Sequence, residues 1–328
     1  MAKKFTYLLG AGASAEALPL IKRQNGGKPG LSESLIDFIY TNKGKIEGSN
    51  GGLSLWKTLD DITVQCKLFG TPDLYAKFLI ETGDDRRYKL LIRLLSNYFA
   101  YFQKDYDAGA ATVEAKFDRR ALNFLTVISS NKKLPDNVSV LSWNYDSQIE
   151  MAAERLKPVG SGPDAKIKNF RCWPNFIDGE TIDDDKDPFL FHINGIAGYD
   201  YSTRVLSEKR EDALSFDDLD RESLLTFAWE DEERYGKKTF LERRMRLAQK
   251  ICANTNILVI IGYSFPFFNR MIDESLFESM RGSLEKIYFQ DPCLDGQQLV
   301  GKFNLSNDLK GKIVHISDTD SYHIPFEL

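Results

Sequence analysis

Residues 5–14 of the chain read FTYLLGAGAS, an apolar run that stops at two closely spaced glycines, Gly10 and Gly12. The run predicts a buried strand, and the glycines predict a tight turn that opens a helix. The first N–H groups of such a helix would face a pyrophosphate, and a side chain at either glycine would hold the phosphate off the backbone. The full dinucleotide fingerprint has a third glycine where this chain has Ala15, so an ordinary strand-to-helix turn is the alternative.

Other short apolar segments, each bounded by turn residues, predict further strands of one buried parallel sheet. The predicted strands are Phe5–Leu9, Val138–Trp143, Phe189–Ile193, Ile257–Ile261, Ile287–Gln290 and Lys312–Ile316. Helical periodicity marks Leu31–Tyr40, Asp73–Glu81, Arg87–Phe102 and Arg119–Ser129. The pattern predicts an α/β fold with a Rossmann-like, mostly parallel sheet flanked by helices and carrying inserted helical modules.

The predicted domain organisation follows from these segments. Residues 1–40, 131–200 and 251–328 are expected to form the Rossmann-like domain, and residues 41–130 a helical insertion. Residues 201–250 are expected to form a second, charged insertion with a basic helix around Leu241–Lys250. Arg243, Arg244 and Arg246 in that helix predict a solvated face, with a partner-binding patch as the alternative.

Composition restricts the class of protein. The chain has 328 residues, of which 42% are hydrophobic and 28% charged, as in ordinary globular domains. Its formal net charge of −5 argues against duplex nucleic acid or an anionic membrane as its main ligand. The longest apolar run, Ile257 to Phe268, is too short to cross a bilayer, and the N-terminus has no room for a signal peptide, so a cytoplasmic protein is expected. Four scattered cysteines without a C-x-x-C pair predict neither a zinc site nor disulfides, and no metal is expected.

Polar residues follow three of the predicted strands, where ligands bind in open α/β sheets. Asn144 and Asp146 follow the second strand, His192 lies at the end of the third with Gly195 just after it, and Gly262-Tyr263-Ser264 follow the fourth. Such residues suit cleavage of a ribose–base bond, which passes through an oxocarbenium-like cation. Asn144 and Asp146, which are two residues apart, could hold the nicotinamide carboxamide by hydrogen bonds, and His192 could take a proton from water or a ribose hydroxyl. The alternatives are a structural histidine and, for Asp146, an Asx turn or helix cap.

The ordered set G-A-G-x-S, N-x-D, histidine and G-x-S resembles the sirtuin family. The match covers most of the predicted sheet domain and little of either insertion. It implies NAD as the substrate, with His192, Asn144 and Asp146 as catalytic residues. The cofactor-binding residues that it implies are Gly10, Ala11, Gly12, Ala13, Ser14, Pro19, Gly195, Gly262, Tyr263, Ser264 and Asp291.

The chain departs from the protein-deacetylating sirtuins at three places. The region of their four-cysteine zinc module holds only Cys252, and the loop after the first glycines keeps Pro19 but not the acid–aromatic–arginine sequence. His192 is also followed by Ile193-Asn194-Gly195 rather than directly by glycine. The pattern is more similar to bacterial sirtuin-like NAD hydrolases of antiphage systems, which lack the zinc module.

The resemblance therefore implies a cytoplasmic NAD glycohydrolase that releases nicotinamide and ADP-ribose as the NAD-depleting effector of an antiphage system. Because unregulated NAD loss would poison the host cell, control by homo-oligomerisation or by a separately encoded partner, such as an ATPase or nucleotide-processing protein, is expected. NAD-dependent deacylation or ADP-ribosyl transfer is one alternative. A non-catalytic sensor of NAD, ADP-ribose or a related nucleotide is the other.

Overall fold

The computed structural model describes residues 2–21, 28–48, 52–103, 117–156, 167, 170–174, 189–198, 216, 223–230, 238–303 and 307–328. Within these residues, seven strands form one sheet in the order β3-β4-β2-β1-β5-β6-β7, and every neighbouring pair is parallel. The strands are β1 (Phe5–Leu9), β2 (Val138–Ser142), β3 (Cys172–Trp173), β4 (Leu190–His192), β5 (Ile257–Ile261), β6 (Lys286–Gln290) and β7 (Ile313–Ile316). The predicted Rossmann-like α/β fold is confirmed.

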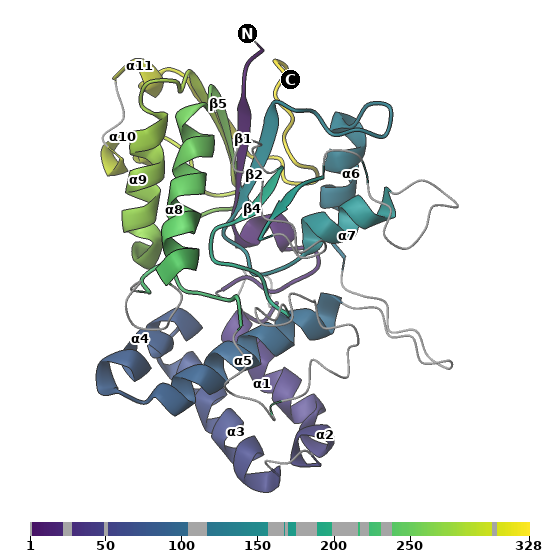
Figure 1. The fold of residues 1–328 in the computed structure, drawn as a ribbon, viewed down its shortest axis with the longest axis vertical. Helices are drawn as coiled ribbons and strands as arrows, with labels where there is room; N and C mark the ends of the chain where they lie inside the picture. The colour runs from purple at the N-terminus through teal and green to yellow at the C-terminus, as the bar shows by residue number, and fades with distance from the viewer. Residues whose placement is uncertain are drawn as a thin grey trace.

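The two faces of the sheet are covered by different helices (Figure 1). Because successive side chains of a strand point to opposite faces, Phe5, Tyr7 and Leu9 share a core with α6 (Arg119–Ile128) and α7 (Gln148–Arg155). Leu8 points the other way and packs in the core formed by α8 (Lys238–Ala253) and α9 (Arg270–Met280). Burial on both faces explains why the strands read as continuous apolar runs.

A separate helical module lies beyond the carboxyl ends of the strands, at the bottom of Figure 1. It consists of α1 (Leu31–Thr41), α2 (Lys43–Glu47), α3 (Gly52–Leu68), α4 (Pro72–Thr82) and α5 (Asp85–Gln103). The module has its own apolar core, to which Phe227 from the segment after β4 also belongs. Two short helices, α10 (Gln298–Lys302) and α11 (Asn307–Lys310), precede β7.

The packing differs from the expected domain boundaries at three helices. The first helix, α1, packs in the module core rather than on the sheet. Helix α6, which was expected in the insertion, packs on the sheet, and so does α8 from the second insertion. Residues 201–215, 217–222 and 231–237 of that insertion lie outside the described residues.

Arg244 on α8 does not belong to a solvated face, so the prediction for it is wrong. Its side chain is buried, and Nη1 lies 3.4 Å from the carbonyl oxygen of Ile193 and 3.3 Å from Thr226 Oγ1. The guanidinium therefore connects α8 to the loop after β4. Of the helices that the structure describes, none has both the length and the apolar character needed to cross a bilayer.

Candidate functional site

The order in which strands are added to the sheet reverses at β1, which makes the carboxyl end of this strand a topological switch point. β2 adds to one side of β1, and β5, reached after β4, adds to the other. Leu9 is in register with both Ser142 and Ile261, so the turns that follow β1, β2 and β5 begin at one level. Ligands of open α/β sheets bind in the crevice at such a point.

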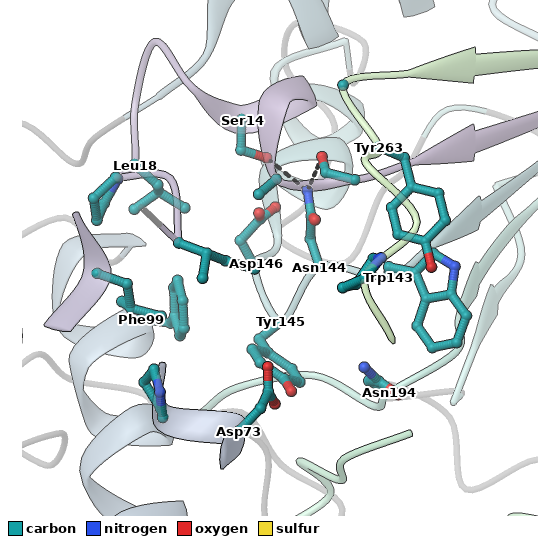
Figure 2. Close-up of a pocket in the computed structure, with 18 of the residues that line it drawn as sticks. Ser14, Leu18, Asp73, Phe99, Trp143, Asn144, Tyr145, Asp146, Asn194 and Tyr263 are labelled. Carbon is teal, nitrogen blue, oxygen red and sulfur yellow. Dashed lines mark hydrogen bonds between the residues drawn. The ribbon is translucent and has the colours of Figure 1, made fainter. Parts of the chain in front are cut away.

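A pocket lies at this crevice, between the sheet and the helical module, and its empty volume is about 920 Å³ when the adjoining open solvent is included. Gly10, Ser14, Asn144 and Asp146 form what we call its sheet end. The rest of its lining comes from the module, from the segments after β1, β2 and β5, and from Asn194 and Phe227 after β4 (Figure 2). The predicted residues that line it are Gly10, Ala11, Ser14, Pro19, Asn144, Asp146, Gly262, Tyr263 and Ser264.

The glycine turn differs from the expected phosphate cradle. After β1 the chain forms a four-residue 3-10 helix, Ala11–Ser14, instead of an α-helix. Two of its N–H groups are used internally, since Gly12 N donates to the Gly262 carbonyl at 3.0 Å and Ala13 N donates to the Gly10 carbonyl at 2.9 Å. A Cβ at Gly12 would lie 2.6 Å from Gly262 Cα. Gly12 is thus needed for the contact between the turns after β1 and β5, whereas the sequence suggested contact with a phosphate.

Asn144 joins the turn after β2 to the turn after β1. Its Nδ2 donates to the Gly10 carbonyl at 2.9 Å and to Ser14 Oγ at 3.2 Å, the two dashed contacts in Figure 2. Its backbone N–H donates to Ser142 Oγ at 3.1 Å. Because both amide protons are used, Oδ1 is the atom of Asn144 that can contact a ligand in the pocket.

Asp146 is a buried carboxyl at the sheet end of the pocket. Burial raises its pKa to about 6, although hydrogen bonds from the Ser14 hydroxyl and the Gln148 backbone N–H and the nearby His192 oppose this rise. The Gln148 N–H lies 3.2 Å from Oδ1, which is the Asx turn that the sequence offered as an alternative. The Asp146 side chain therefore accepts a hydrogen bond from the first N–H group of α7 and also faces the pocket.

Tyr263 lines the pocket with its ring, because its hydroxyl donates to Asp273 Oδ2 at 2.8 Å. The ring stacks on Trp143 with the centroids 5.8 Å apart, and Trp143 also lines the pocket. Together these two rings provide a flat apolar wall beside Asn144.

His192 lies behind the sheet end and outside the lining of the pocket. It is 1% exposed, with Nδ1 3.3 Å from the Asn144 carbonyl and Nε2 2.7 Å from Glu150 Oε1. Burial lowers its pKa, but Glu150, the Asn144 carbonyl and Asp146 outweigh burial and raise it overall. Both ring nitrogens face acceptors, so the ring holds the turn that carries Asn144 and is not presented to a molecule in the pocket.

Glu150, Cys172 and His192 form a cluster whose potential ligand atoms lie within 4.8 Å of one another. These donors suit Zn²⁺ in type, although a structural zinc site takes four ligands. The 2.7 Å contact between His192 and Glu150 and the 3.6 Å contact from Cys172 Sγ to Glu150 Oε1 account for the arrangement as hydrogen bonds. We therefore treat this cluster as support for the Asn144 turn.

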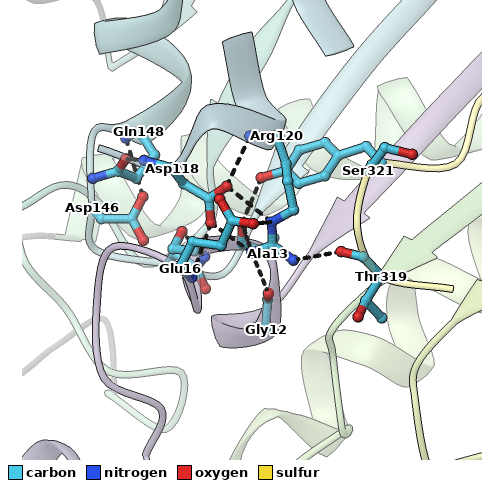
Figure 3. A network of polar contacts seen from close by, with 12 residues as sticks. Gly12, Ala13, Glu16, Asp118, Arg120, Asp146, Gln148, Thr319 and Ser321 are labelled. Atoms are coloured by element: carbon cyan, nitrogen blue, oxygen red, sulfur yellow. Dashed lines mark hydrogen bonds and ion pairs between the residues drawn. The ribbon is translucent and has the colours of Figure 1, made fainter. Parts of the chain in front are cut away.

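A buried polar network supports the glycine turn (Figure 3). Arg120 Nη2 donates to the carbonyls of Gly12 and Ala13, both at 3.1 Å, and Nη1 donates to the Thr319 carbonyl at 3.1 Å. Asp118, which is fully buried, accepts from Arg120 Nε at 2.9 Å. The network therefore fixes the turn by its carbonyl groups.

Four other predicted site residues lie elsewhere. Gly12 and Ala13 do not belong to the pocket lining, as their contacts with Gly262 and Arg120 explain. Gly195 has a φ of +72°, and a Cβ there would lie 1.7 Å from the Leu224 carbonyl oxygen, so it serves loop packing. Asp291 Oδ1 accepts from the N–H groups of Cys293 and Leu294 at 2.8 and 2.7 Å, which makes it a turn residue after β6.

Several pocket residues gave no signal in the sequence. Pro72 and Asp73 come from α4, Leu95 and Phe99 from α5, and Phe227 from the segment after β4. Asp73 was predicted only as the first residue of a helix. Tyr145 lies between Asn144 and Asp146, and Asn194 directly precedes Gly195, so their positions in these turns were the available signal.

The resemblance to the sirtuin family rests on the motifs quoted above and remains a prediction. A scan against protein-family models and a search of the curated proteins found no match to this chain.

Proposed function

We propose that the chain is a sirtuin-like NAD glycohydrolase, which cleaves NAD into nicotinamide and ADP-ribose. The observation that carries this proposal is the convergence of Asn144, Asp146 and the glycine turn on one pocket at the switch point of the sheet.

The reaction breaks the bond between ribose C1′ and the pyridinium nitrogen. The electron pair of that bond goes to the nitrogen, so nicotinamide leaves as a neutral molecule and the sugar becomes an oxocarbenium-like cation. The Oδ1 of Asn144 carries partial negative charge and is held in place by the two bonds of its Nδ2. Such a fixed dipole can stabilise the developing cation without reorganising.

Asp146 is the group that we assign as base in the second half of the reaction. A water oxygen attacks C1′, and its proton passes to the Asp146 carboxylate and then to solvent, which balances the hydrolysis. A pKa of about 6 keeps the Asp146 carboxyl ionised in most molecules above pH 7, and it makes the carboxylate a stronger base than an exposed one. His192 then acts as a positioning residue, since it contacts the Asn144 carbonyl.

The proposal includes a cellular role and a means of control. We infer an NAD-depleting effector of antiphage defence in the cytoplasm, held inactive as a homo-oligomer or by a separately encoded ATPase or nucleotide-processing partner. The free thiols of Cys66, Cys172, Cys252 and Cys293 suit a reducing compartment. Full constitutive activity in a monomer, measured by size-exclusion chromatography with an NAD assay, would contradict this part of the proposal.

The test is NAD turnover by the purified chain, with products separated by chromatography. We expect nicotinamide and ADP-ribose in equal amounts, and Asp146→Asn should lower kcat by about 100- to 10,000-fold. Asn144→Ala should lower it as well. The matched control is Asp85→Asn, which changes an exposed carboxyl of α5 outside the pocket lining.

Two further assays distinguish the proposed hydrolase from the other two enzyme activities, deacylation and ADP-ribosyl transfer. An acetyl-lysine peptide should leave the rate unchanged, whereas NAD loss that requires the peptide would indicate a deacylase. Transfer of labelled ADP-ribose to protein would indicate an ADP-ribosyltransferase. Unchanged turnover in Asp146→Asn would rule out the base that we assign.

A non-catalytic nucleotide sensor is the second candidate, and the burial of His192 favours it. The sequence expected this residue as the base, yet both of its ring nitrogens already have partners. A sensor would bind NAD or ADP-ribose tightly without turnover, alone or with any partner. Asp146→Asn would then leave the downstream response intact.

A further inference from the structure

The end of the pocket farthest from the glycine turn contains polar groups that the proposed reaction does not use. We call Asp73, Tyr145 and Asn194 the distal end, and Figure 2 shows them across the pocket from Ser14 and Asp146. Asp73 comes from α4 of the helical module, while Tyr145 and Asn194 come from the turns after β2 and β4. A ligand in the pocket would therefore touch both the sheet and the module.

Asn194 presents a hydrogen-bond acceptor without a partner. The residue is 4% exposed, and within the described part of the chain no donor reaches its Oδ1. Its side-chain nitrogen donates to the hydroxyl of Tyr145, and its backbone carbonyl accepts from Thr226 N at 2.9 Å. A buried acceptor left in this state costs free energy, and a ligand N–H would remove that cost.

Asp73 presents a carboxyl group at the same end. It lies close enough to Tyr145 to raise the pKa of that hydroxyl, after the larger effect of burial. Burial raises the pKa of Asp73 itself to about 7. Near pH 7 the carboxyl is therefore protonated in a large fraction of the molecules, and in that form it can donate a hydrogen bond.

The walls between these groups are aromatic. Phe99 and Phe227 line the pocket beside Tyr145, with ring centroids 5.9 and 6.4 Å from the Tyr145 ring. Aromatic faces attract a cationic ring such as a pyridinium. A flat cationic ring that carries both a carbonyl and an N–H group would suit the Asp73 carboxyl and the Asn194 Oδ1 at the distal end.

We propose that Asp73 and Asn194 clamp the carboxamide of the nicotinamide leaving group. Asp73 donates to the carboxamide oxygen, and Asn194 Oδ1 accepts from the carboxamide N–H. The helical module thereby supplies a specificity residue to a site whose reaction residues come from the sheet. This inference rests on the proposed function, because it assumes that NAD occupies the pocket.

The test measures dissociation constants at pH 6.5 for NAD, for ADP-ribose, which lacks the nicotinamide, and for 3-acetylpyridine adenine dinucleotide, which lacks the amide N–H. Asp73→Ala should weaken NAD binding about 5- to 10-fold and leave ADP-ribose binding unchanged. Asp73→Asn, which keeps a donor, should stay within about threefold of the unmodified chain. Asn194→Ser should remove the preference for NAD over the acetylpyridine analogue.

Asp85→Asn is the control and should change none of these constants. Equal weakening of NAD and ADP-ribose by Asp73→Ala, or no weakening of either, would overturn the clamp. A chain that binds NAD through the clamp but never cleaves it would refute the hydrolase and keep the clamp. A chain that binds no NAD would overturn both proposals.

Discussion

At the scale of single residues, the pocket contains a buried carboxyl that weakens the fold and a glycine that the backbone requires. Burial keeps Asp146 partly protonated, with its pKa raised to about 6 from an ordinary value of 3.8. Gly262, at the end of β5, has a φ of +57° and touches Gly12 backbone to backbone. A destabilising buried carboxyl such as Asp146 is common where a site has been built for a ligand.

Asp146→Asn should stabilise the chain without ligand. Between pH 3.8 and about 6 the folded state holds more of the Asp146 proton than the unfolded state, so this residue's contribution to stability falls as pH rises through that window. Removing the charge should therefore raise the free energy of unfolding at pH 7.5 by about 1–3 kcal/mol, and by much less at pH 4. Urea denaturation at the two pH values measures this difference. An equal effect at both would show that the charge is not the cause.

Gly262→Ala should destabilise the chain, because the new Cβ would lie 2.4 Å from Gly12 Cα in a left-handed backbone conformation. The expected loss is about 2–4 kcal/mol of unfolding free energy. Gly282→Ala is the matched control, since no atom lies within 4 Å of its Cβ position. If the two variants had equal melting temperatures, the close contact between the turns would be ruled out.

At the scale of elements, the turn after β1 depends on segments that are distant in sequence. Arg120 at the start of α6 donates hydrogen bonds both to a carbonyl of this turn and to the chain after β7. Tyr322 Oη donates to the Ala13 carbonyl at 2.7 Å. A four-residue 3-10 helix has too few internal hydrogen bonds to hold its own orientation. The pocket therefore depends on α6 and on the C-terminal segment.

Arg120→Met should cost about 3–5 kcal/mol, because it leaves the fully buried Asp118 carboxylate without its partner. Tyr322→Phe removes one hydrogen bond and should cost about 1 kcal/mol. Arg281→Met is the control, since its ion pair with Glu278 is exposed and should contribute less than about 1 kcal/mol. Chemical denaturation of the three variants provides the comparison, and a small loss for Arg120→Met would mean that Asp118 finds another partner.

At the scale of the whole molecule, the pocket lies between two units that have separate apolar cores. The sheet and its covering helices form two of the cores, and the module forms the third (Figure 1). Tyr88 Oη on α5 donates to Glu230 Oε1 at 2.7 Å, which connects the module to the segment after β4. A ligand that contacts Asp146 and Asp73 together would add a further connection.

NAD should therefore slow amide hydrogen exchange on both sides of the pocket. We expect protection in residues 10–15 and 262–266 of the sheet and in residues 71–79 and 95–102 of the module. ADP-ribose should protect the sheet peptides alone, since it lacks the nicotinamide that we assign to the module. Peptides of β6 and β7 serve as the control, because neither strand lines the pocket. Protection confined to the sheet with NAD would contradict a ligand that spans both units.

The sequence was sufficient for the sheet and for its polar edge. β1 and β5 have the predicted bounds, because strands buried on both faces must be apolar throughout and end where turn residues begin. Asn144 and Asp146 could be predicted to lie at the pocket because the carboxyl ends of parallel strands meet at one edge. Helix α3 (Gly52–Leu68) was missed although Trp56, Leu59, Ile62 and Cys66 carry its buried face, and β3 was missed because two residues show no period.

Tertiary packing settled the rest of the site. His192 ends a strand as predicted, but Glu150 on α7 and the Asn144 carbonyl enclose its ring, and neither contact can be read from spacing. Asp73 reaches the pocket because the module lies over the carboxyl ends of the strands, a placement that its own helix does not encode. Local pattern fixes which face of an element is buried, whereas the partner of a polar side chain depends on how separate elements pack.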